Sequence, residues 1–256
     1  MKKFHVVVSR PEIWQSSLVG LLQKQGLIAN NPKDACGILV FGGDGTILRA
    51  IRNHWKRELL FSGFCFGHLG FLTNEASEQT LQEIIAGLYQ IVSVRLLKAQ
   101  LFDSQGRELG EEMAFNDFYV KSTNITQTAK IRVTVDNRVR FDPLVCDGVL
   151  VCTQAGSTAY NLSASGEVLP IDFEGMVLTG ICPHQQKYRW RSTILPKDAE
   201  VVFEAVGTEE RPVVFVADNK ILQGVVKARI RYSDSVIRLT FANSQDFRER
   251  VLRLKF

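Results

Sequence analysis

Five consecutive residues, Gly42-Gly43-Asp44-Gly45-Thr46, have the types and the order needed to bind phosphate. They follow an apolar run of buried-strand type, and behind them Ile47, Ile51 and Trp55 repeat every four residues, so a helix is predicted there. A strand, a glycine turn and a helix in this order present backbone N–H groups and the positive end of the helix at one point. The glycines also permit close approach of a ligand. The segment therefore predicts an anion site, for phosphate above all.

Asp44 is the unusual member of this turn, because a carboxylate repels phosphate unless a cation or a hydroxyl lies between them. A hydroxyl that accepts a phosphoryl group needs orientation and a proton acceptor, and positioning alone can supply roughly 7 to 11 kcal/mol of the lowered barrier. Asp44 is therefore the predicted proton acceptor of a phosphotransferase. On local sequence alone, the same residues could instead form a tight turn in which Asp44 caps the following helix. The signatures GxxxxGK[ST] and GxGxxG do not occur at this turn.

Composition narrows the class of protein. The chain has 256 residues, 45% hydrophobic and 23% charged, which suits one large globular domain or two smaller ones. A net charge of +4 is too mild for a nucleic-acid binder but suits a nucleotide ligand. The N-terminal apolar run is too short for a signal peptide, and the longest run, Leu59 to Leu72, is too short for a membrane span. Five cysteines without metal-ligand spacing indicate a reduced protein, so we expect a cytoplasmic protein without a membrane partner.

Alternating strand-like and helical segments fill the first ninety or so residues, which is typical of parallel strands covered by helices. Strands are predicted at Phe4 to Ser9, at Cys36 to Phe41 and at about Leu59 to Phe66. One helix is expected to start at Pro11 and to close at Gly26. This part of the chain therefore predicts an α/β arrangement.

A further helix is predicted behind Ser77, which can cap its first turn. Its apolar stripe consists of Leu81, Ile84, Ile85 and Leu88, at the spacing i, i+3, i+4, i+7. This helix would be the last before the rhythm of the sequence changes.

From about Gln90 the chain consists of short runs rich in Val, Ile, Phe and Thr. Turn signals such as Asp136-Asn137, Asp218-Asn219 and Ser233-Asp234 separate these runs. A sheet-rich second domain is therefore predicted. One stretch, Thr153 to Gly166, is small and polar and fits neither a core strand nor an amphipathic helix.

Three segments taken together resemble the NAD kinases, the enzymes that phosphorylate the 2′-hydroxyl of the adenosine ribose of NAD to make NADP. The first is the glycine turn, which a wider superfamily of lipid and sugar kinases shares. The second is Gly67 to Leu72, with the sequence Gly-His-Leu-Gly-Phe-Leu. The third is Asp147-Gly148 followed by Thr153 to Tyr160, and it is far more selective. Their order and spacing cover the chain from about Ile38 to Asp218.

The resemblance implies a fold. It consists of an N-terminal Rossmann-like α/β domain and a β-rich, β-sandwich-like domain, with the C-terminal tail returning to the first domain. We accordingly expect an α/β phosphate-binding domain over residues 1–92 with 244–256, and a β-rich NAD-binding domain over residues 93–243.

The resemblance also implies residue roles. Asp44 would accept the proton of the 2′-hydroxyl, while Gly42, Gly43, Gly45 and Thr46 would hold the phosphates of ATP. Further NAD contacts are expected from residues in both predicted domains. The expected NAD-binding set is Asp44, Gly45, Phe71, Leu72, Asn116, Asp117, Asp147, Thr158, Ala159, Tyr160, Ser163 and Asn219.

Two of these matches have a second interpretation. Asn116-Asp117 looks like the family's Asn-Glu pair, which contacts the adenosine part, but a polar strand end would also explain it. Asp147 matches an aspartate that binds the nicotinamide side, in some members across a subunit boundary, but Asp-Gly is also a turn signal.

The implied reactants are ATP as donor and NAD as substrate, with Mg²⁺ or another divalent cation bridging the phosphates. No metal ligand is identified. Family members form dimers and tetramers with shared sites, so a homo-oligomer is expected.

Departures from the family pattern are Cys65 for asparagine, Gln154 for proline, and Ser165-Gly166-Glu167 for Gly-Gly-Pro. They leave open a catalytically weak dinucleotide-binding sensor, and the glycine turn alone also fits a lipid or sugar kinase. ATP against polyphosphate as donor, and NAD against NADH as acceptor, are likewise open.

Overall fold

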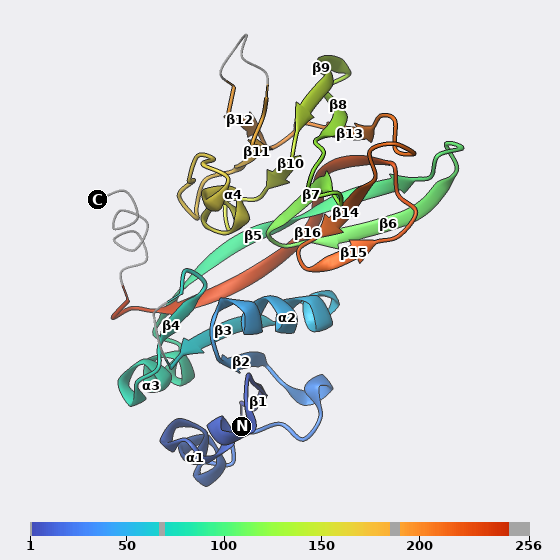
Figure 1. Cartoon of the computed structure of the whole chain (residues 1–256). Helices are drawn as coiled ribbons and strands as arrows, with labels where there is room; N and C mark the ends of the chain where they lie inside the picture. The colour runs from blue at the N-terminus through green and yellow to red at the C-terminus, as the bar shows by residue number, and fades with distance from the viewer. Residues whose placement is uncertain (1, 67–69, 185–189, 246–256) are drawn as a thin grey trace. The chain divides into compact units, whose positions relative to one another are not determined.

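The computed structural model describes residues 2–66, 70–184 and 190–245 (Figure 1). Two compact units result, one made of residues up to Val94 with the segment from Val236, the other of Arg95–Ser235. Strands β5 (Tyr89–Phe102) and β16 (Lys227–Ala242) contribute residues to both units.

The first unit is built on parallel strands in the order β1-β2-β3-β16. Every residue of β2 is buried, as expected for a parallel strand with helices on both faces. The strands predicted from the sequence in this part of the chain are confirmed, each within one residue of its expected ends. The remaining bounds are β1 (Phe4–Val8), β2 (Gly37–Phe41), β3 (Leu60–Cys65) and β4 (Thr73–Glu75), which pairs with the end of β3.

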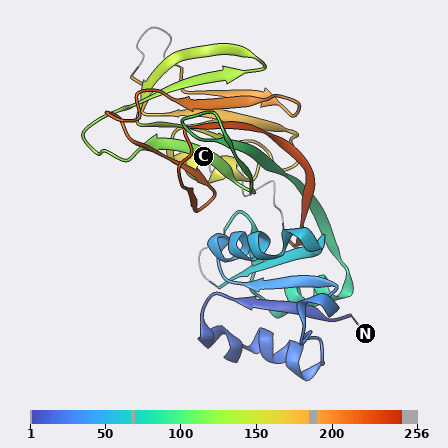
Figure 2. The same cartoon turned by 90° about the vertical axis from the view of Figure 1, so that its right-hand side faces the viewer.

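Helices lie on both sides of this sheet (Figure 2). On one face, Leu22 of α1 (Ser17–Lys24) and Leu81 of α3 (Glu78–Ala86) pack with Phe41 and Phe64 of the strands. On the other, α2 (Asp44–His54) lies so close to β3 that a β-carbon at Gly63 would stand 3.0 Å from the Ile47 side chain. Short 3-10 helices complete the unit: η1 (Pro11–Gln15), η2 (Pro32–Asp34) and η3 (Trp55–Arg57).

Three helix predictions need correction at their ends. The helix expected from Pro11 is divided, because Ser16 is extended between η1 and α1. The cap by Ser77 is confirmed, with its Oγ accepting from the Thr80 N–H at 3.1 Å. Leu88, however, lies beyond α3 and is 55% exposed, because Gly87 takes a left-handed conformation with φ of 84° and ends the helix. The third correction, the start of α2, concerns the glycine turn and is described with the site.

The second unit is rich in antiparallel strands. Six of them form one sheet in the order β12-β11-β10-β7-β14-β15, and β9, β8, β13 and the first part of β16 are paired in a second. Buried side chains of both, such as Val149 and Phe203, belong to one hydrophobic core, which gives a sandwich-like unit. The strands are β6 (Glu108–Ala114), β7 (Asp117–Ser122), β8 (Ala129–Val135), β9 (Arg138–Cys146), β10 (Gly148–Cys152), β11 (Gly175–Ile181), β12 (Ser192–Pro196), β13 (Val201–Ala205), β14 (Val213–Ala217) and β15 (Lys220–Leu222).

The predicted turns are confirmed at two places and wrong at a third. Asp136 and Asn137 have φ of 50° and 60°, as the tight hairpin between β8 and β9 requires. Asp218 lies between β14 and β15 with φ of 53°. Ser233-Asp234 instead lies inside β16, where the chain stays extended and the Ser233 Oγ accepts locally from the Ser235 N–H at 3.1 Å.

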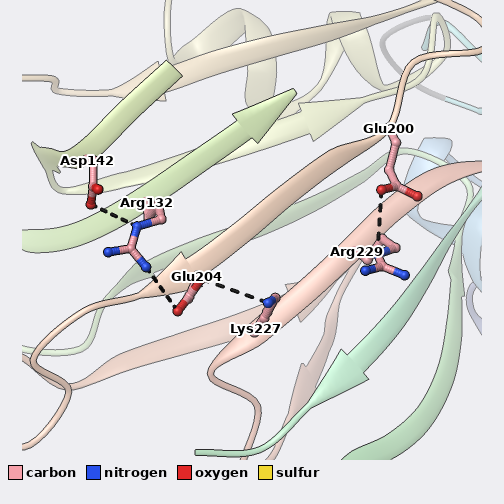
Figure 3. A network of polar contacts seen from close by, with 6 residues as sticks. All are labelled: Arg132, Asp142, Glu200, Glu204, Lys227 and Arg229. Carbon is pink, nitrogen blue, oxygen red and sulfur yellow. Dashed lines mark hydrogen bonds and ion pairs between the residues drawn. The ribbon is translucent and has the colours of Figure 1, made fainter. Parts of the chain in front are cut away.

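Charged residues pair on the side of β8 that faces away from the core (Figure 3). Arg132 lies with its Nε 2.8 Å from Asp142 Oδ1 and its Nη1 3.3 Å from Glu204 Oε1. These side chains are each at least 35% exposed, so solvent screens the pairs and each contributes little to stability. The other pairs drawn are Glu204 with Lys227 and Glu200 with Arg229.

Nowhere in the described ranges is a helix long and apolar enough to cross a bilayer.

Candidate active site

The glycine turn connects β2 directly to α2. Gly43 is the N-cap of the helix and Asp44 is its first residue, so the helix starts before Thr46 and Asp44 is not the capping residue. Gly42 is required by packing, since a β-carbon there would stand 2.5 Å from Thr46 Oγ1 and 2.8 Å from the Ser9 β-carbon. Thr46 is buried beneath the turn, whereas Gly43 and Gly45 are exposed. The turn therefore offers its two exposed glycines and the start of a helix to an anion.

The Asp44 carboxylate is held by the chain segment that follows β3. Its Oδ2 accepts from the Phe71 N–H at 2.8 Å and its Oδ1 from the Leu72 N–H at 3.1 Å. The Thr73 hydroxyl lies 3.5 Å from Oδ1. Phe71 and Leu72, predicted as NAD contacts, thus also orient Asp44 through their backbones. Because a carboxylate can accept about four hydrogen bonds, this anchoring is compatible with a further bond to a substrate hydroxyl.

Gly70 explains why the second motif needs a glycine before Phe71. A β-carbon at Gly70 would lie 2.5 Å from the Asp44 Cγ and 2.8 Å from its Oδ2. Any side chain at this position would displace the carboxylate. Of the same motif, Gly67, His68 and Leu69 lie outside the described residues, as do residues 246–256 of the tail that was assigned to the first domain.

A cavity of about 610 Å³ opens beside Gly42 and Gly43. The end of β1 contributes Ser9 and Arg10 to its lining, and the end of β3 contributes Cys65 and Phe66. A volume of this size is typical of small-molecule pockets. The glycine turn is therefore part of a hollow rather than of a flat surface.

In the second unit, Asp218 organises the Asn116-Asp117 pair. Its Oδ1 accepts from the N–H groups of Asn116 and Asp117 at 2.7 and 3.3 Å, and its Oδ2 from that of Phe115 at 2.9 Å. The Asp218 N–H in turn donates to the Asp117 carbonyl at 2.9 Å. In the sequence, Asp218 is recognisable only as part of a turn signal. An aspartate at a predicted hairpin turn, whose carboxylate can accept from neighbouring amides, is the signal that could have found it.

The side-chain oxygen of Asn116 is a buried hydrogen-bond acceptor. The residue is 7% exposed, and its Oδ1 has no hydrogen-bond partner within the described part of the chain. An unpaired buried acceptor costs free energy, which a ligand N–H or O–H would recover. The position therefore suits recognition of a polar ligand.

Asp117 is buried at 4% exposure, and burial together with the nearby Asp218 carboxylate raises the pKa of Asp117 to about 8. At neutral pH its carboxyl group is thus largely protonated and can donate a hydrogen bond. The same residue could accept a hydrogen bond through its other oxygen.

The polar stretch after β10 forms two short helical turns, η4 (Gly156–Thr158) and α4 (Tyr160–Ser163). It is tied to the Asn116 strand end, because the Thr153 N–H donates to the Asn116 carbonyl at 2.9 Å. Gly156 must stay a glycine, since a β-carbon there would stand 2.6 Å from the Asn116 carbonyl carbon. The two predicted segments therefore lie in direct contact.

Asn161 fastens the end of this stretch. Its Nδ2 donates to the carbonyls of Ser157 at 3.0 Å and Glu167 at 2.8 Å, and its Oδ1 accepts from the Thr179 hydroxyl at 2.6 Å. The substituted loop Ser165-Gly166-Glu167 is thereby held in place. Gln154, the other substituted position nearby, is buried, with its Oε1 3.0 Å from the Tyr232 hydroxyl.

Tyr160, the first residue of α4, also lies near Asp117. Its ring meets Tyr119 edge-on at 5.1 Å, and burial first, then the charges of Cys182, Asp117 and Asp147, raise its pKa. Asp117 and Asp147 are thus close enough to Tyr160 to influence its pKa. Of the remaining predicted residues, Thr158 and Ala159 are half-buried, whereas Asp147, Ser163 and Asn219 are exposed.

Known proteins match this chain over nearly its whole length. The model of the ATP-NAD kinase N-terminal domain matches residues 14–92, and that of the C-terminal domain residues 115–240. A protein named NAD kinase from Brucella suis biovar 1 is 35% identical, over 98% of this chain and 96% of the relative. One from Caulobacter vibrioides is 36% identical, over 88% and 85%.

Two solved structures share the fold. Yeast NADH kinase complexed with NADH has a TM-score of 0.81 at 18% identity, covering 99% of this chain and 87% of that one. An NAD kinase from Archaeoglobus fulgidus in complex with ATP has a TM-score of 0.78 at 23% identity, covering 99% and 98%. The predicted fold class is thereby confirmed.

Proposed function

The chain belongs to the NAD kinase family, and on that premise we propose that it transfers the terminal phosphoryl group of ATP to the 2′-hydroxyl of the adenosine ribose of NAD, giving NADP. One observation carries the proposal at the level of chemistry: Asp44, at the end of a phosphate-binding turn, has both carboxylate oxygens oriented by backbone N–H groups. Because the Asp44 side chain is already held in place, it loses little conformational entropy when the substrate binds.

In the reaction, Asp44 takes the proton of the 2′-hydroxyl as the ribose oxygen forms its bond to the terminal phosphorus. The bond from that phosphorus to the bridging oxygen of ATP breaks, and ADP leaves with the electron pair. Gly42, Gly43, Gly45 and Thr46 form the turn that holds the donor phosphates at the start of α2. The exposed Gly43 and Gly45 offer their backbone N–H groups, whereas those of Gly42 and Thr46 donate to the Phe64 and Gly43 carbonyls. Most of the acceleration then comes from positioning rather than from a strong base.

The acceptor is recognised by the second unit. Asn116 offers its buried Oδ1 to the adenine amino group, and Asp117, largely protonated, holds a ribose hydroxyl. Tyr160 provides an aromatic face and a hydroxyl. Thr158, Ala159, Ser163, Asp147 and Asn219 line the rest of the dinucleotide, with Asp147 on its nicotinamide side. Gly45, Phe71 and Leu72 are proposed as further NAD contacts.

A divalent cation, Mg²⁺ in the simplest case, would neutralise charge on the donor phosphates when bound. Within the described ranges, no three His, Cys, Asp or Glu side chains are grouped so that they could hold a metal ion. Mg²⁺ commonly binds through substrate phosphates, water and one or two carboxylates, which the residues present can accommodate. Asp44 is the carboxylate of the turn that would share it.

The protein is further proposed to act in the cytoplasm as a homo-oligomer, a dimer or tetramer with shared sites. Its five cysteines are all free thiols, as a reducing compartment maintains them. Light scattering after gel filtration measures the oligomeric state directly, and a monomer at working concentration would reject the proposed homo-oligomer.

The test of the function is incubation of purified protein with ATP, Mg²⁺ and NAD, followed by enzymatic measurement of NADP. We expect Asp44→Asn to lower kcat by at least about a hundredfold while nucleotide binding and the melting temperature persist. Binding of NAD without product in the unmodified protein would instead identify a sensor.

A further inference from the structure

We infer that the cavity beside the glycine turn selects a nucleoside triphosphate over inorganic polyphosphate, with Arg10 positioning the phosphates and Phe66 contacting the base. The inference rests on the proposed function, and it concerns the donor, whereas the residues discussed so far concern the turn and the acceptor.

The cavity lies entirely within the first unit, where the ends of β1 and β3 adjoin the glycine turn. The Ser9 N–H donates to the Phe41 carbonyl and the Gly42 N–H to the Phe64 carbonyl, at 2.9 and 2.8 Å, so three strand ends are tied together at its wall. Its volume of about 610 Å³ exceeds what a short chain of phosphates fills. There is room for a base and a sugar as well.

The charge of the lining argues against a polyphosphate tract. Among the described residues that line the cavity, Arg10 is the one cationic residue and Glu12 is the one carboxylate. The charged side chains therefore cancel. A polyphosphate chain carries about one negative charge per phosphate and would need several cations along its path, as polyanion-binding grooves provide.

The remaining lining is suited to an apolar, flat group. Phe66 is 47% exposed although its ring lies 6.2 Å from that of Phe41, and Ile13 and Cys65 line the same cavity. A half-exposed aromatic ring at a cavity wall is a platform on which a nucleobase can stack. Stacking discriminates a nucleotide from inorganic phosphate, because only the nucleotide has a π face.

Arg10 supplies the phosphate end. It is exposed at the N-cap of η1, and its guanidinium forms no hydrogen bond or ion pair with the described residues around it. The planar guanidinium matches two oxygens of a phosphate at once. Its contact with the phosphates adds to that of the turn, since both border the same cavity.

The experiment measures binding of ATP and of inorganic tripolyphosphate, each with Mg²⁺, to the full chain by calorimetry. We expect ATP to bind at least about tenfold more tightly than tripolyphosphate. Phe66→Leu, which keeps an apolar side chain but removes the ring, should weaken ATP about tenfold and leave tripolyphosphate within about twofold. Arg10→Gln should weaken both ligands by about tenfold or more.

Matched controls are Phe173→Leu, at an aromatic residue that is 41% exposed in the second unit, and Arg138→Gln, at an exposed residue of β9. Neither should change the affinity for either ligand. Melting temperatures of all variants report folding, and Arg10→Gln, at an exposed position, keeps the test valid even if Phe66→Leu folds poorly.

Equal affinity for the two ligands, or loss of both ligands alike in Phe66→Leu, would overturn the inference. So would unchanged KM for ATP in both variants while NADP forms normally, a result that leaves the proposed function standing. The opposite result, ATP binding that depends on both residues without any NADP formed, would support the inference and reject the function.

Discussion

Replacing Gly70 by alanine tests whether the orientation of Asp44 matters as the structure implies. The new β-carbon would lie 2.5 Å from the Asp44 Cγ, whereas ordinary contact begins at 3.4 Å, so the carboxylate must retreat by about 0.9 Å or more. Its bonds to the Phe71 and Leu72 N–H groups would lengthen or break. A misplacement of about 1 Å can cost on the order of a hundredfold in rate.

We therefore expect Gly70→Ala to lower kcat for NADP formation by about a hundredfold, while KM for ATP and for NAD change by less than about threefold. The matched control is Gly20→Ala in α1, where a β-carbon meets nothing within 4 Å. Stopped-time assays of NADP, with melting temperatures for both variants, measure the outcome. A Gly70→Ala protein that turns over normally would refute the idea that these amides position the base.

Three further predictions concern the second unit. Asp218→Asn should weaken the hydrogen bonds to the backbone N–H groups of Asn116 and Asp117. It should therefore raise KM for NAD and lower the free energy of unfolding, measured by urea titration, by about 1 to 3 kcal/mol. An unchanged KM together with unchanged stability would contradict this prediction. Because the pKa of Asp117 is raised from 3.8 to about 8, the native state keeps a proton that the unfolded chain loses, so stability should fall as pH rises from about 4 to about 8 and then level off. Asp117→Asn should remove that slope, and an equal slope in the variant would reject the assignment. Arg132→Ala should leave the free energy of unfolding almost unchanged, because solvent screens its pairs with Asp142 and Glu204. A clear loss of stability in the same titration would show that the network is cooperative.

Much of the first unit could be predicted from the sequence, since β1, β2 and β3 are largely apolar and the helices carry local signals, whereas the short polar β4 gives no such signal. The Ser77 cap is an example, because the bond to the Thr80 N–H involves only neighbours in the chain. The loss of Leu88 from α3 shows the limit. Its spacing fits a helix, but the left-handed Gly87 overrides periodicity.

The site divides in the same way. The glycine turn and its Asp44 follow from a short motif, whereas the bonds from Phe71 and Leu72 to Asp44 join residues 27 and 28 positions apart and depend on tertiary structure. Asp218 was missed as an anchor for the same reason, because its partners lie about a hundred residues earlier in the chain. Ser233-Asp234 failed in the opposite direction, since a local turn signal gave way to the pairing of a long strand.

Asn161 has a bearing on which sequences this fold can tolerate. The atoms that it grips at Ser157 and Glu167 are carbonyl oxygens, which every amino acid supplies. Position 167 is thus interchangeable with respect to this grip, whereas position 166 is not, because a β-carbon on Gly166 would stand 2.6 Å from the Asn161 Cγ. When folded variants are selected from a library randomised across this loop, asparagine at 161 and glycine at 166 should be retained. The neighbouring positions should accept other residues.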